Sequence, residues 1–223
     1  MPPNDRMDTT PDITAPERSR SALLARGVAL EYFTIGYNAF EGVVAILAGV
    51  LAGSVALVGF GLDSVIEIAA GMTLLWRLRR ETQIGADISE AEHSSLERRA
   101  LLIIGVTFFA LSAYIAIEAG YMLVTGGGAE ESTVGIILAV ASLVIMPALA
   151  FLKQRTARGL NSHALAADAM ETWVCSYLSL ILLAGLGLNA AFGWGWADPL
   201  AALAMLPLVI KEGWEAFEEG REE

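Results

Sequence analysis

The length of its apolar blocks limits this chain to few folds. Each block extends over about 20 residues, which is what an α-helix needs to cross the hydrocarbon core of a bilayer. Hydrophobic residues make up 55% of the chain and charged residues only 17%, and the core of a soluble domain would not require such blocks. The blocks are residues 28–52, 55–76, 100–124, 133–152, 163–188 and 197–210. The sequence therefore predicts an all-α membrane protein with six transmembrane helices, the first two joined by a tight turn at Gly53-Ser54.

Basic residues predict the orientation of these helices. If six helices alternate across the bilayer, every Lys and Arg falls on one side, and cytoplasmic loops carry such an excess. Both termini should then be cytoplasmic. The polar residues 1–27 are expected to form a disordered cytoplasmic tail without a cleavable signal peptide. We expect the transmembrane domain to comprise residues 28–217, followed by a short acidic tail, residues 218–223.

Two pairs of potential metal ligands lie inside the apolar blocks. Asp63 and Glu67 are four residues apart in the second block, and Glu171 and Cys175 are four apart in the fifth. This spacing places both members of a pair on one helix face, and carboxylates are costly enough inside a bilayer to indicate function. At 1.5 Å per residue, both pairs reach one layer near the midplane of a core about 30 Å thick. The sequence thus predicts one metal site between the second and fifth helices.

The chemistry of such a site couples metal ions to protons. Three carboxylates and a thiol in one desolvated layer cannot all be ionised without metal, because burial and like-charge repulsion disfavour the charged forms. A divalent cation favours the deprotonated ligands, so metal binding expels protons. The donor set suits zinc or cadmium and is also compatible with iron, cobalt and manganese. The chain contains no Gly-x-x-x-x-Gly-Lys-Ser/Thr loop, which favours a secondary transporter over an ATP-driven one.

Several segments resemble the cation diffusion facilitators, a family that exchanges zinc and related divalent cations for protons. Residues 42–71, with Leu62-Asp63-Ser64-Val65-Ile66-Glu67, look like that family's first two helices, and residues 167–175 look like its fifth. Residues 196–202 and 211–216 are similar to its sixth helix and the exit from it. The resemblance covers residues 25–217. It implies a homodimer, with Glu171 in place of a family His and Cys175 in place of a family Asp.

The chain also departs from the family pattern. The family usually continues into a cytoplasmic metal-binding and dimerising domain, whereas this sequence stops at Glu223. We therefore expect regulation through that domain to be absent and a dimer to form through membrane helices.

Further polar residues are weaker candidates for the pathway or a secondary site. Asp168, three residues before Glu171, could be a ligand, a carboxylate on the access path or a partner for a backbone group, and we favour the access path. Glu41 and Asn38 could line the same cavity, or Glu41 could be hydrogen-bonded within the bundle. His163 could be a capping residue or could feed metal toward Asp168.

Two other features are predicted to be structural. Asp198, directly before Pro199, is expected to cap the start of a helix, because its side chain can accept hydrogen bonds from free backbone amides. The acidic residues in the tail after Glu212 are expected to be solvated surface.

The sequence therefore predicts a multi-pass protein of the bacterial cytoplasmic membrane that exports a divalent cation, zinc first, in exchange for protons. We expect no enzymatic activity, no prosthetic group and no nucleic-acid partner. The alternative from another class is a membrane metal sensor or interaction subunit that binds ions without moving them. A third hypothesis is that the buried acids function only in proton movement or in packing.

Overall fold

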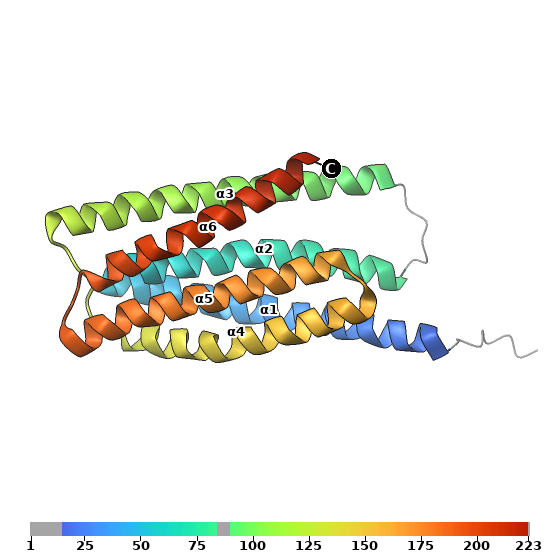
Figure 1. The fold of residues 1–223 in the computed structure, drawn as a ribbon, viewed down its shortest axis with the longest axis horizontal. Coiled ribbons are helices and arrows are strands. Elements are labelled where there is room, and N and C mark those ends of the chain that lie inside the picture. Colours follow the sequence, from blue (N-terminus) through green and yellow to red (C-terminus); the bar gives the residue numbers. More distant parts are fainter. Residues whose placement is uncertain (1–14, 84–89, 223) are drawn as a thin grey trace, which may run out of the picture.

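The computed structural model describes residues 15–83 and 90–222, and these ranges fold into six long helices without a strand. The helices lie roughly along one axis (Figure 1). Their bounds are α1 (Ala15–Ala52), α2 (Val55–Gln83), α3 (Glu90–Thr125), α4 (Thr133–Leu160), α5 (His163–Phe192) and α6 (Ala197–Glu222). The predicted all-α architecture is confirmed.

Five of these helices, α1 to α5, contain a stretch that is long and apolar enough to cross a membrane. The sixth, α6, does not reach the same standard of apolarity. It has Asp198 in its first turn, and Lys211 and Glu212 follow its apolar segment. It nevertheless runs along the bundle beside α3, which is its main packing partner (Figure 1).

Helix α1 is longer than its apolar block. It begins at Ala15, so the prediction of a disordered tail is wrong for residues 15–27, and residues 1–14 of that tail lie outside the described residues. Pro16 suits the first turn of a helix. Farther along, Leu24 is buried against Leu74, Leu78, Ala157 and Leu165. Packing on α2, α4 and α5 therefore supports a helical segment that hydropathy alone did not predict.

The other predicted tail is also helical where it is described. Helix α6 continues to Glu222, so residues 218–222 extend the helix instead of forming a separate acidic segment. The sixth apolar block ends at residue 210, so the helix continues for 12 residues beyond its apolar part. Glu has a high helix propensity, so exposed residues such as Glu218 are compatible with a helix in water.

The chain ends and connections divide the bundle into two ends. One end, here called the basic end, contains the start of α1, the end of α2, the start of α3, the α4–α5 connection and the end of α6 (Figure 1). The connections between α1 and α2, α3 and α4, and α5 and α6 lie at the opposite end. The described parts of the segments expected to carry the Lys and Arg residues are thus at one end of the bundle.

Close packing of α1 on α2 depends on small residues. A Cβ atom at Gly49 would lie 2.7 Å from Val58 Cγ2 and 2.8 Å from the Val58 backbone nitrogen. One at Gly61 would lie 2.9 Å from Ala45 Cβ. Between the two helices, Gly53 has a φ of +62°, which confirms the predicted tight turn. Small residues allow this approach in a lipid environment, where no hydrophobic force drives helices together.

Helix α2 occupies the centre of the bundle. It packs mainly on α1 and also contacts α3, α5 and α6, while α4 packs mainly on α5. Helices α2 and α5, which carry the two predicted ligand pairs, therefore face each other.

Hydrogen bonds tie the helices together at the opposite end. Asp198 of α6 is fully buried and accepts hydrogen bonds from Ser54 Oγ at 2.5 Å, from Val55 N at 2.9 Å and from Ala56 N at 3.4 Å. The predicted capping role is thus present, but the capped helix is α2 and not the residue's own helix. Nearby, Asn189 Nδ2 donates to the carbonyl oxygen of Ala129 at 2.8 Å.

Candidate metal centre

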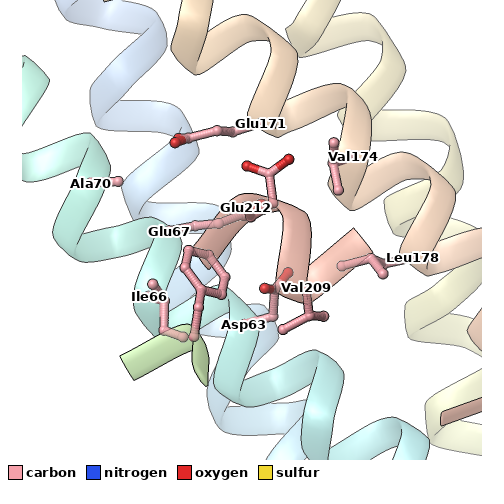
Figure 2. Close-up of a pocket in the computed structure, with 10 residues that line it drawn as sticks. Asp63, Ile66, Glu67, Ala70, Glu171, Val174, Leu178, Val209 and Glu212 are labelled. Atoms are coloured by element: carbon pink, nitrogen blue, oxygen red, sulfur yellow. The ribbon is translucent and has the colours of Figure 1, made fainter. Parts of the chain in front are cut away.

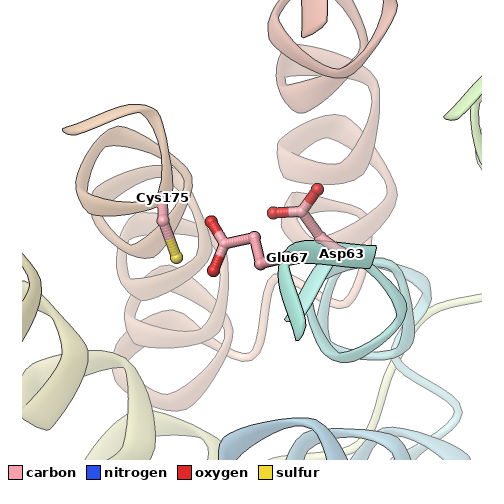
Figure 3. Close-up of side chains that lie close together, drawn as sticks. All are labelled: Asp63, Glu67 and Cys175. Carbon is pink, nitrogen blue, oxygen red and sulfur yellow. The ribbon is translucent and has the colours of Figure 1, made fainter. Parts of the chain in front are cut away.

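Three of the four predicted ligands converge at the α2–α5 interface. One ligand atom each of Asp63, Glu67 and Cys175 lies within 4.8 Å of the other two (Figure 3). Around a tetrahedral zinc ion with bonds of about 2.0–2.3 Å, two ligand atoms lie about 3.3–3.8 Å apart. The three side chains would therefore have to close by up to about 1 Å to hold one divalent cation.

Glu171, the fourth predicted ligand, lies outside this compact group. It lines a small cavity together with Asp63, Glu67 and Glu212 (Figure 2). The cavity has a volume of about 10 Å³, which admits about one water-sized sphere. Glu171 is four positions before Cys175, so the two residues are offset by about 6 Å along α5. The structure thus assembles three predicted ligands directly and places Glu171 across the cavity from Asp63 and Glu67.

Asp63, which is buried, and Glu67, which is half-buried, differ in their hydrogen-bond partners. Asp63 is only 5% exposed, and no hydrogen bond or ion pair joins it to another described residue. Glu67 Oε2 accepts a hydrogen bond of 2.7 Å from Asn38 Nδ2. Asn38 is fully buried in α1, so it fixes the orientation of Glu67 as an outer-shell partner does in metal sites. Asp63 retains its full capacity to bind a cation.

Glu41 belongs to a different polar network, between α1, α2 and α4. Ser64 donates a hydrogen bond of 3.0 Å to its Oε2, and Ser142 donates one to its Oε1. The Ser142 and Tyr37 hydroxyl oxygens are 2.8 Å apart. Both carboxylate oxygens of Glu41 are thus partnered by hydroxyl groups within the bundle, which was one of the two alternatives drawn from the sequence.

A buried ion-pair network lies toward the basic end. Lys153 of α4 is fully buried, and its Nζ is 3.1 Å from Glu31 Oε1 of α1 and 2.5 Å from Asp168 Oδ2 of α5. Sequence reasoning missed Glu31 and placed Lys153 in the connection after the fourth helix. Glu31 precedes Asn38 by seven residues, which places both on one face of α1 and is a signal that could have found it. Asp168, expected on the access path, is also an ion-pair partner.

A larger cavity, here called the vestibule, lies at the basic end and has a volume of about 420 Å³. Its polar lining consists of Thr73, Arg77, Asp168, Glu171, Lys211, Glu212 and Glu215. Glu171 and Glu212 also line the small cavity, so the two spaces meet at these side chains. The sequence reading treated Glu212 as the start of a solvated tail. Glu212 lies one helical turn after Val209, which also lines the small cavity. This spacing on one helix face is the sequence signal that could have identified Glu212.

His163 is the first residue of α5 and is exposed. The cap of this helix is Ser162, whose Oγ accepts a hydrogen bond from Leu165 N at 3.4 Å. The nearby vestibule lining is provided by Ala164 and Ala167. No described contact of His163 thus supports a role in feeding metal toward Asp168, and that role stays a prediction.

The helical bundle, with acidic and thiol side chains gathered at its centre, has the architecture of a multi-pass membrane protein that handles cations. Residues 33–223 match the cation efflux transmembrane domain, and the chain belongs to this family. The resemblance drawn from the sequence is confirmed.

Individual relatives are distant in sequence. An uncharacterized transporter of Synechocystis sp. is 26% identical over 188 residues, which cover 82% of this chain and 56% of the relative. The magnetosome protein MamB of Magnetospira sp. is 24% identical over 184 residues, covering 82% and 61%. The cation-efflux pump FieF of Citrobacter koseri is 28% identical over 170 residues, covering 74% and 56%. The chain thus spans between 56% and 61% of the length of these relatives.

Proposed function

We propose that this protein is a secondary transporter that exports a divalent cation, zinc first, from the cytoplasm in exchange for protons. The observation that carries the proposal is the convergence of Asp63, Glu67 and Cys175 within 4.8 Å in the interior of a membrane bundle. Ionisable groups are costly inside a bilayer, and packing alone does not account for three of them gathered at one point of the α2–α5 interface. Membership of the cation efflux family supports the same function.

The donor set supports zinc and proton exchange together. A thiolate with carboxylates suits a borderline divalent cation, and Glu171 across the cavity adds a further oxygen donor. Without a cation, like charges in a volume of about 10 Å³ favour protonation. A divalent cation reverses this preference, so each binding event releases protons and each protonation weakens metal binding.

The two ends of the bundle support loading from the cytoplasm. Cytoplasmic segments carry the excess of basic residues, so we place the basic end and both termini in the cytoplasm. The vestibule then faces the cytoplasm, while the hydrogen bonds of Asp198 tie α6 to the start of α2 at the opposite end. Export requires a second arrangement in which the vestibule narrows and the opposite end opens.

We further propose a homodimer in a bacterial cytoplasmic membrane. The relatives from Synechocystis, Magnetospira and Citrobacter support the bacterial setting, and the family resemblance supports the dimer. Cross-linking in native membranes would test the dimer independently of transport.

The test of the function is zinc flux in proteoliposomes that contain a zinc-sensitive dye and carry an imposed pH gradient. Wild-type protein should move zinc against its own concentration gradient only when the pH gradient is present, and Asp63→Asn should abolish the flux. Glu118→Gln is the matched control, because Glu118 is a half-buried acid of α3 that lines neither cavity described above.

Other outcomes would refute the proposal in distinct ways. Zinc binding to the purified protein without flux at any gradient would identify a sensor or interaction subunit. Absence of zinc binding would indicate that the buried acids serve only in proton movement or in packing.

A further inference from the structure

The small cavity and the vestibule meet beside Ala70 of α2, between helices α5 and α6. Four residues line both spaces, namely Ala70, Glu171, Val174 and Glu212. Two of the four are carboxylates, one on each of these helices, and Figure 2 shows both among the side chains that surround the small cavity. A cation that moves from the vestibule to Asp63 through this junction passes both carboxylates.

These carboxylates are free to bind a cation. Neither Glu171 nor Glu212 forms a hydrogen bond or ion pair with another described residue. Lys211 is the basic residue of the vestibule nearest to Glu212 in sequence. It forms an ion pair with Glu215 instead, with Lys211 Nζ 2.8 Å from Glu215 Oε1. On the inner side, the 5%-exposed and unpartnered Asp63 carboxylate lines the same small cavity. The passage therefore has unpaired acceptors on both sides.

We propose that Glu171 and Glu212 form a transfer station, a second cation-binding position between the vestibule and the buried Asp63, Glu67 and Cys175 cluster. This inference rests on the proposed function. The station takes a partly hydrated divalent cation, because it offers carboxylate oxygens only and opens to a vestibule of about 420 Å³. The inner cluster then binds the cation after it loses water, since the cavity of about 10 Å³ has no room for a hydration shell.

The station assigns a function to α6, the helix that falls short of the apolarity of a membrane span. Glu212 places a negative charge beside Glu171 at the inner end of the path, and a cleft in which acidic side chains outnumber basic ones raises the local concentration of cations. Replacing it should slow the arrival of metal at the cluster more than it weakens final binding. A residue of the station therefore affects mainly the rate of loading, whereas a ligand of the cluster affects the final binding.

Cobalt(II) provides the test, because ligation by the Cys175 thiolate produces a sulfur-to-cobalt absorption band. The rate at which this band appears after mixing purified protein with Co²⁺ reports arrival at the inner cluster. Cys175→Ser should remove the band and so identify it. Glu212→Gln should reduce the rate about tenfold, within the range over which charged clefts raise association rates, and leave the final amplitude unchanged. The rate for wild-type protein should also fall with added salt more steeply than that for Glu212→Gln.

Two further variants keep the test specific. Glu218→Gln removes the same charge from an exposed position of α6 outside both cavities and should load at the wild-type rate. Glu212→Asp retains the carboxylate and should recover most of the rate, which a general folding defect would not allow.

Wild-type loading by Glu212→Gln would overturn the station while leaving the proposed function intact. Loss of the final amplitude in Glu212→Gln, as complete as in Asp63→Asn, would overturn it too, because Glu212 would then be a ligand of the cluster. Absence of the band in wild-type protein would overturn the proposed function and the station with it.

Discussion

Lys153 is expected to be the most sensitive charged residue for the stability of the bundle. The substitution Lys153→Met keeps a long side chain and removes the ammonium group that lies 3.1 Å from Glu31 Oε1 and 2.5 Å from Asp168 Oδ2. Glu31 is fully buried, so water cannot replace its lost partner, whereas Asp168 is 12% exposed and lines the vestibule. Breaking a buried ion pair by removing one member typically costs about 3–5 kcal/mol, and we expect a loss in this range.

The same chain offers a matched control for this substitution. Lys211 forms an ion pair of 2.8 Å with Glu215, but the two side chains are 58% and 56% exposed. A pair of this kind contributes about 0.3–0.5 kcal/mol, so Lys211→Met should have little effect. The assay is reversible unfolding of the purified protein in mixed micelles as the fraction of denaturing detergent is increased.

A second control separates charge from packing. The triple variant Lys153→Met, Glu31→Gln, Asp168→Asn removes all three charges together, and it should recover most of the lost free energy of unfolding because no uncompensated carboxylate is left. Equal effects of Lys153→Met and Lys211→Met, or a triple variant less stable than Lys153→Met alone, would refute the reasoning.

Three further predictions concern the metal centre and the helix contacts. Cys175→Ser should weaken zinc binding more than manganese binding in calorimetric titrations, because zinc gains more from a soft sulfur ligand; equal losses would argue against ligation by the thiol. Asn38→Ala should lower zinc affinity about 10–100-fold without abolishing binding, since it removes the hydrogen bond that orients Glu67, and unchanged affinity would contradict that role. Gly49→Ala should destabilise the bundle by about 1–3 kcal/mol through overpacking against Val58. In the same unfolding assay Gly36→Ala should be neutral or stabilising, because no atom lies within 4 Å of the added Cβ; equal losses would exclude steric overlap as the cause.

The sequence determined the class of fold and the helices that carry the ligands. Apolar blocks of about 20 residues can satisfy their backbone groups in a bilayer only as helices, which fixes the all-α architecture. The i, i+4 spacing of Asp63 with Glu67 and of Glu171 with Cys175 fixes which face of each helix is polar. These are local properties, so a single sequence contains them.

Tertiary structure decided which charges meet. Glu31, Lys153 and Asp168 come from three different helices, and their pairing depends on how α1, α4 and α5 pack. Asp198 caps α2 and not its own helix for the same reason, because the free amides nearest to it belong to another segment. The approach of Glu212 to Glu171 likewise depends on where α6 lies beside α5. Hydropathy and spacing describe one helix at a time, whereas the partners of a buried charge depend on the rotation and depth of every helix around it.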